Sequence, residues 1–332
     1  MGAVQAQDYP GAKWALGLRI PALTDTDVER AFSEGHILRT HVLRPTWHFV
    51  TPADIRWMLD LTGPRVRRMN ASYYRKLGLD DALVARCRRI MERALGGGTQ
   101  LTRAQIGTAL RRAGIAIDRL ALAHVMMDAE LTGVVCSGAR EGKQFTYALL
   151  EERAPRAKPL TRDEALAELT RRYFTSHGPA TIRDYVWWSG LAVGDARRGI
   201  EILGSGLQRK LLGDDPHWAA PARAAMPAAR GAHLLPNYDE YLIAYQDRGT
   251  VVGPARLRAV GPKGSDVFAH NFIIDGRLAG SWTRTHGRDE ARVHVVSYGR
   301  LTPPDRRAIA AAAERYGRFM QQQVICAQRS VR

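Results

Sequence analysis

The sequence predicts an α+β protein built from tandem winged-helix (helix-turn-helix) domains, followed by a small C-terminal β-barrel and a terminal helix. Two observations support this prediction. In the first two thirds of the chain, a pattern of capped helices followed by a short hairpin is repeated. In the last third, the pattern is one of short strands separated by Gly, Pro and Asp. A length of 332 residues allows several domains. We predict three winged helices over 1–75, 76–157 and 158–230, and a barrel with its helix over 231–332.

The first repeat of helices and hairpin begins after an expected turn at Pro10-Gly11. Thr24-Asp25-Thr26-Asp27 supplies an N-cap, and Gly35 ends the helix that follows it. Thr51-Pro52 has the composition of a helix start, with Pro in the first turn. We therefore expect helices over 13–19 and 28–34, strands over 37–43 and 46–50, and a further helix from Pro52.

The second and third repeats follow this order with diverged sequences. We expect helices over 83–95, 103–113 and 119–131, a hairpin over 134–149, a capping box at Thr161–Glu164, and helices over 182–189 and 193–203 packed through Trp187 and Trp188. The hairpin bends at 138–143, where the spacing of Gly and Lys does not fit a nucleotide-binding loop. Arg140 and Lys143 at this bend fit a wing that contacts DNA or a solvated turn.

The C-terminal third has the pattern of a small barrel or a curved sheet. We expect strands over 251–260, 267–274, 278–284 and 292–298, and a final helix from Pro303 to about Ile325. The expected hairpin around 284–288 is cationic and has a size suited to a DNA groove.

The charge of the chain favours a polyanionic partner. The sequence holds 49 Lys+Arg against 33 Asp+Glu, a net charge of +16, with a pI near 10.3. The stretch from Arg65 to Arg112 is strongly basic and is opposed only by Asp80, Asp81 and Glu92. A GC-rich genome would explain Arg in preference to Lys, but it would not explain the excess over acids. Nucleic acid is the natural partner of such a surface.

Other classes of protein lack their usual signals in this sequence. Cys87, Cys136 and Cys326 are widely spaced, which favours a reducing, cytoplasmic environment without a disulfide framework. No apolar run approaches the ~20 residues of a membrane helix. The histidines and cysteines show no metal-ligand spacing, and no dinucleotide or serine-hydrolase motif is present. We expect no cofactor, no metal, no membrane association and a monomer.

A Gln-aliphatic-Gln triplet, Val4-Gln5-Ala6-Gln7-Asp8, stands near the N-terminus. Alone it is a weak motif, because Gln is usually a solvated surface residue. With its neighbours the chain resembles the bacterial AlkZ/YcaQ-type DNA glycosylases, which are often described only as winged-helix DNA-binding domain-containing proteins. The resemblance covers nearly the whole chain and is carried by MGAVQAQDYPGAKWALGLRI, ILRTHVLRPTWHFVTPADIRWML and LLPNYDEYLIAYQDR.

This resemblance implies a DNA glycosylase whose partner is damaged double-stranded DNA. It implies that Gln5 and Gln7 are the catalytic pair. Around Asp239 and His48 the sequence also matches: Asp239 would orient water or cap a turn, and His48 would serve the site or the core. The candidate DNA contacts are Arg44, Arg140, Lys143, Arg183, Lys263, Arg284, His286 and Arg288.

A carboxamide has no useful pKa, so a Gln pair can hold water and stabilise charge but cannot act as a general base. Such a site suits an activated substrate. N7-alkylated purines are cationic and leave readily, and the resemblance implies their excision, including the unhooking of interstrand crosslinks. A DNA-binding regulator or architectural protein without catalysis is the competing interpretation. Family members usually carry one or two more helices ahead of the triplet, and their loss would expose apolar surface in the first domain.

Overall fold

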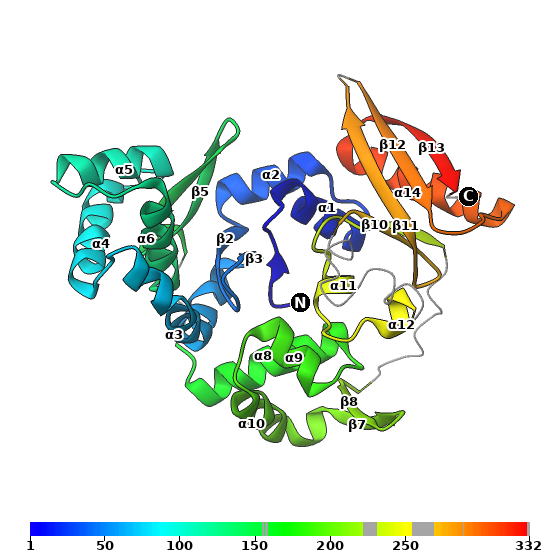
Figure 1. Ribbon diagram of the computed structural model, residues 1–332, viewed down its shortest axis with the longest axis horizontal. Coiled ribbons are helices and arrows are strands. Elements are labelled where there is room, and N and C mark those ends of the chain that lie inside the picture. The colour runs from blue at the N-terminus through cyan, green and yellow to red at the C-terminus, as the bar shows by residue number, and fades with distance from the viewer. Residues whose placement is uncertain (155, 157–158, 222–230, 254–268, 288, 331–332) are drawn as a thin grey trace. The chain divides into compact units, whose positions relative to one another are not determined.

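The computed structural model describes residues 1–154, 156, 159–221, 231–253, 269–287 and 289–330 (Figure 1). The chain divides into two compact units. Unit 1 comprises Met1–Ala3 and Arg30–Ala220, and unit 2 comprises Val4–Glu29 and Pro221–Arg332. Helix α2 (Asp25–Glu34) crosses this division in the sequence. Each unit is described by itself.

The first part of unit 1 is a hairpin followed by a long helix. Strands β2 (Leu38–His41) and β3 (Trp47–Val50) pair antiparallel, with Leu38 opposite Val50. Helix α3 (Pro52–Lys76) has Pro52 in its first turn, where a missing N–H costs nothing, and it continues through Pro64. The predicted strands and the start of the helix are therefore confirmed.

The second part of unit 1 has the order helix, strand, helix, helix, hairpin. Its elements are α4 (Asp81–Leu95), β4 (Leu101–Thr102), α5 (Arg103–Arg112), α6 (Arg119–Leu131), β5 (Val135–Glu141) and β6 (Gln144–Leu149), followed by the short α7 (Leu150–Arg153). The three strands form a sheet in the order β4-β6-β5. Thr102 and Gln105 close a capping box on α5. Apolar faces of the helices and sheet share one core that includes Ile106, Leu110 and Val125.

The third part of unit 1 repeats this arrangement. Helices α8 (Arg162–His177), α9 (Ile182–Ser189) and α10 (Val193–Leu203) lead through a short 3-10 turn, η1 (Gly204–Gly206), into the hairpin β7 (Gln208–Leu212) and β8 (Asp215–Ala219). Ala180 bridges to Trp218 of β8, in the place that β4 takes beside β6. Trp188 is fully buried as expected, whereas Trp187 is 40% exposed. The hairpin β7–β8 was not expected from the sequence.

Unit 2 contains a curled five-stranded sheet and two packed helices. Its elements are β1 (Val4–Gln5), α1 (Tyr9–Arg19), β9 (Ala232–Leu234), α11 (Glu240–Ile243), α12 (Gly249–Val252), β10 (Asn271–Ile274), β11 (Arg277–His286), β12 (Glu290–Ser297), α14 (Pro303–Met320) and β13 (Gln323–Ser330). The strand order is β13-β12-β11-β10-β9, so the described strands form an open sheet with two edges and not a closed barrel. The Trp14 ring of α1 packs on Tyr316 and Phe319 of α14.

Three expectations for unit 2 are corrected by the structure. Pro10 and Gly11 lie in the first turn of α1, because Asp8 caps a helix that begins earlier than predicted. Residues 251–252 are helical, Gly253 caps that helix, and residues 254–260 lie outside the described residues. The final helix ends at Met320, where Gln321 takes a left-handed conformation. The segment after it forms β13, which pairs parallel with β12.

None of the helices in the described ranges combines the length and the apolar composition that crossing a membrane requires.

Candidate active site at the Gln triplet

The Gln triplet lies where a short strand turns into a helix. Gln5 ends β1, residues 7–8 form a bend, and α1 begins at Tyr9. The Asp8 side chain accepts a hydrogen bond from the Gly11 N–H at 3.4 Å, and it thereby caps α1. The strand before the bend and the capped helix after it fix the backbone on both sides of the bend.

The two glutamines are in different environments but in contact. Gln5 is buried and Gln7 is exposed. The Gln7 backbone N–H donates to Oε1 of Gln5 at 3.2 Å. This bond orients the Gln5 carboxamide, because it engages the carbonyl end and fixes the other end as the amino group. The triplet is thus extended at Gln5 and bent at Gln7.

A buried carboxylate, Glu240, holds the triplet from the other side. The Gln5 backbone N–H donates to Glu240 Oε1 at 2.8 Å, and Glu240 is only 1% exposed. The sequence prediction placed its carboxylate at the neighbouring Asp239 and missed Glu240. The signal was available, since a second acid stands beside Asp239 in the same matched segment.

Asp239 has other partners. Its carboxylate receives two hydrogen bonds from the Arg19 guanidinium, at 2.8 and 2.9 Å, and it accepts the Tyr241 N–H as the N-cap of α11. Burial opposes the charge on Arg19, but Asp239 and then Glu240 outweigh it and raise the Arg19 pKa. A bidentate pair of this kind anchors α11 to α1. The structure therefore brings together Gln5, Gln7 and Glu240, whereas Asp239 is paired with Arg19.

His48 belongs to unit 1 and is fully buried in β3, opposite Thr40. Its Nδ1 donates to the Thr46 carbonyl at 2.9 Å, which fixes the neutral tautomer. Burial, reinforced by the charge of Arg44, holds the pKa of His48 well below its usual range. His48 is therefore neutral at physiological pH.

A cationic and aromatic cluster lies in the half of the β11–β12 hairpin that is next to its turn, in unit 2. The Arg284 guanidinium lies over the rings of Trp282 and Tyr316 and donates to Nε2 of His270. Burial and the charge of Arg284 lower the pKa of His270 to about 4, so this ring is a neutral acceptor. Tyr316 in turn shares a hydrogen bond with His286 at 3.0 Å. The cluster fixes Arg284 without neutralising it.

The remaining candidate DNA contacts are divided between loops and helices. Lys143 is exposed beside the bend of the β5–β6 hairpin, and Arg140 stacks on Phe145 of the same hairpin at 5.2 Å. Arg183 is exposed in the first turn of α9, and Arg44 is half-buried between β2 and β3. Lys263 and Arg288 lie outside the described residues.

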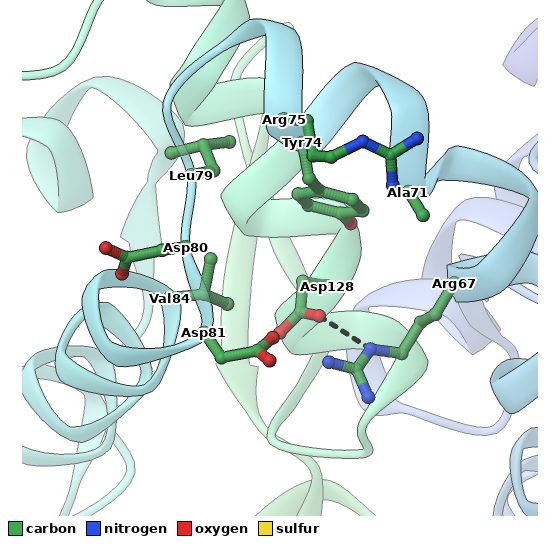
Figure 2. Close-up of a pocket in the computed structure, with 9 residues that line it drawn as sticks. All are labelled: Arg67, Ala71, Tyr74, Arg75, Leu79, Asp80, Asp81, Val84 and Asp128. Atoms are coloured by element: carbon green, nitrogen blue, oxygen red, sulfur yellow. Dashed lines mark hydrogen bonds and ion pairs between the residues drawn. The ribbon is translucent and has the colours of Figure 1, made fainter.

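Figure 2 shows a separate pocket of about 350 Å³ in unit 1. The buried Asp128 carboxylate in it accepts from Arg67 of α3 at 2.8 Å, and also from Arg88 of α4 at 2.7 Å. These two ion pairs tie α3 and α4 to α6. Asp128 is thus engaged by two cations, and the pocket contains none of the residues predicted for catalysis.

Comparisons with known proteins define the class. A family model described as DNA glycosylase AlkZ-like matches residues 1–319, so the chain belongs to that family. The protein is a DNA glycosylase, an enzyme that acts on DNA.

Two individual relatives extend this result. The interstrand DNA cross-link repair glycosylase of Streptomyces sahachiroi is 25% identical over 301 residues, which cover 84% of this chain and 79% of that protein. The solved structure of Streptomyces sahachiroi DNA glycosylase AlkZ superimposes with a TM-score of 0.82 at 21% identity, over 99% of this chain and 91% of that one. The second likeness shows the fold.

Proposed function

We propose that the protein is a monofunctional DNA glycosylase that hydrolyses the N-glycosidic bond of cationic N7-alkylated purines, with Gln5 and Gln7 holding the attacking water. The observation that carries this proposal is the fixed Gln5 carboxamide. Its carbonyl is engaged by the Gln7 N–H and its backbone by Glu240, both within 3.2 Å. A pre-oriented dipole of this kind suits a reaction in which the site stabilises a developing charge and does not need to remove a proton.

The proposed step needs no strong base. The oxygen of water adds to C1′ of the deoxyribose while the bond from C1′ to N9 breaks. The electron pair of that bond remains on N9 and cancels the positive charge of the alkylpurine, which leaves as a neutral base. The water gives up one proton to solvent. Because the leaving group is already activated, carboxamides that position the water are sufficient.

The arrangement of unit 1 supports DNA binding through winged helices. The order α4-β4-α5-α6-β5-β6 with its sheet β4-β6-β5 is typical of a winged helix, and α8 to β8 repeat the order. In this proposal the β5–β6 hairpin is the wing. We propose that Lys143 and Arg140 at this wing contact phosphates, with Arg183, Arg44, Arg284 and His286 as further contacts. Phosphate contacts position the duplex and carry no sequence information.

The relative from Streptomyces sahachiroi is named for interstrand cross-link repair. We propose that the substrates here include crosslinks formed through N7 of guanine. Unhooking such a lesion breaks the same bond as excision of a simple N7 adduct, and the cation at N7 provides the same activation. A tight base-flipping pocket would not accept a base that is still joined to the opposite strand.

Gln5→Ala and Gln7→Ala test the catalytic assignment. Each variant should lower single-turnover release of 7-methylguanine from alkylated duplex DNA by about 100-fold or more, the scale of a lost charge-stabilising donor. The affinity for undamaged duplex should stay within about twofold, because phosphate contacts supply most non-specific binding.

Gln321→Ala is the matched control, since Gln321 is a glutamine of unit 2 at the end of α14. It should release 7-methylguanine at the parent rate. If the triplet variants lose DNA affinity and activity together, the triplet is a structural element and the assignment is wrong.

A further inference from the structure

Glu240 occupies a position that a neutral group would fill at lower cost. The Gln5 backbone N–H donates to Glu240 Oε1 at 2.8 Å, and a neutral carbonyl could accept this bond equally well. A carboxylate that is 1% exposed carries a desolvation penalty that a carbonyl does not. A buried carboxylate is therefore weak evidence of a purely stabilising role, and its position beside Gln5 directs attention to the reaction.

The carboxylate is also held firmly in place. Asp239 caps α11 immediately before Glu240, and Arg19 of α1 grips Asp239 with two hydrogen bonds. Glu240 thus approaches Gln5 from a short helix that is itself tied to α1. Its charge acts on its surroundings, since it contributes to the raised pKa of Arg19.

The proposed reaction creates the charge that a carboxylate would stabilise. As the bond from C1′ to N9 breaks, the deoxyribose takes on oxocarbenium character, and the positive charge moves from the purine to the sugar. The Gln dipoles stabilise this charge only partly. A full negative charge in a site of low dielectric stabilises it more strongly.

We propose that Glu240 is a positioning residue of this site with an electrostatic function: it fixes Gln5 and places a negative charge beside the deoxyribose. This inference rests on the proposed function. The inference assigns different roles to the two acids of the segment. Asp239 stabilises the fold, and Glu240 stabilises charge in the reaction.

The variant E240Q tests the charge alone, because a Gln side chain keeps the carbonyl that accepts the Gln5 N–H. Single-turnover release of 7-methylguanine should fall by about 10- to 100-fold. The Kd for the same duplex should stay within about twofold, and the Tm should not fall. E29Q is the matched control: Glu29 is a carboxylate of the same unit that binds Lys13 of α1 at 2.8 Å and accepts a hydrogen bond from the Tyr9 hydroxyl at 3.1 Å. E29Q should keep the parent rate.

Two abasic-site analogues provide a second readout that a purely structural role would not change. Duplexes carry either a cationic pyrrolidine or a neutral tetrahydrofuran in place of the lesion nucleotide. The parent should bind the cationic duplex at least about tenfold more tightly, and E240Q should lose this preference. If E240Q does not fold, E240D is tested instead. It keeps the negative charge, and it should therefore still bind the cationic duplex more tightly than the neutral one.

The outcomes separate the two proposals. If the parent releases no 7-methylguanine, the proposed function fails. If the parent releases it and E240Q matches the parent rate, Glu240 is only an anchor and this inference is overturned. Equal affinity of the parent for the two analogues, or a loss of the preference in E240D, also overturns it.

Discussion

Two adjacent acids in the segment 236–241 have different partners. Neighbouring residues of a helix do not face the same way, so Asp239 reaches Arg19 while Glu240 reaches Gln5. The sequence identified the segment and the two glutamines, but it could not decide between the acids. That decision depends on α11, which is four residues long and is oriented by tertiary contacts. The candidate residues were thus predicted more successfully than their contacts.

His270 gives the fold a pH dependence at the residue scale. Its pKa in the folded state is lowered to about 4 by burial and by Arg284, below the ordinary value of 6.5. Between these two values the unfolded chain binds a proton that the folded chain does not. The free energy of unfolding contributed by this group therefore falls as the pH is lowered from about 6.5 toward 4.

We expect the Tm of the parent to fall between pH 7 and pH 5 by more than the Tm of His270→Gln. Thermal unfolding at the two pH values measures this difference. His36→Gln is the control, because that side chain is 75% exposed. An identical pH dependence in the parent and in His270→Gln would contradict the assignment.

Elements with local signals were predicted well, and elements that depend on distant partners were not. Helices α6, α9 and α10 have the predicted bounds, because local signals mark them: Asp118 caps α6, Thr181 caps α9, and Gly204 follows the last residue of α10. The first residues of strand β13, up to about Ile325, were predicted to be the end of a helix. The extended form of β13 depends on pairing with β12, and this parallel ladder leaves no mark in the local sequence.

The contact between α1 and α14 gives a prediction at the element scale. A Cβ on Gly17 would lie 2.4 Å from the Phe319 ring, which packs against Trp14. Gly17→Ala should therefore lower the free energy of unfolding by about 1–3 kcal/mol despite the better helix propensity of Ala. Gly194→Ala in α10 meets no atom within 4 Å and should be neutral or stabilising by about 0.5 kcal/mol. Denaturant titration of both variants checks this, and a stable Gly17→Ala would show that the helices are not in close contact.

The β5–β6 hairpin, which is the proposed wing, is expected to contact phosphate. Lys143 is exposed beside its bend. Lys143→Ala should weaken duplex binding and reduce the slope of log Kd against log salt by about 0.9, the release of one counterion. Arg171, which is paired with Glu168 at 2.8 Å, is the control, and Arg171→Ala should leave the slope unchanged. An unchanged slope in Lys143→Ala would place the wing away from the DNA backbone.

At the scale of the whole molecule, the charge of +16 indicated DNA, and the family match gives the reaction class. Charge alone does not separate a regulator from an enzyme, because both contact phosphate. The Gln triplet made the distinction in the sequence. The two compact units were not foreseen: residues 4–29 group with the C-terminal part of the chain, whereas the prediction placed them in a first domain over 1–75. The boundaries of the predicted domains remain a prediction.

The central claim is that a site of two carboxamides acts on bases that are already cationic. Its most direct test compares two duplexes that differ at one nucleotide, which is either 7-methylguanine or its neutral isostere 7-methyl-7-deazaguanine. Single-turnover release of the free base is measured for both with the same enzyme. The account predicts release of 7-methylguanine and no detectable release of the neutral base. Release of both at similar rates would mean that the enzyme activates the leaving group itself, and would contradict the account.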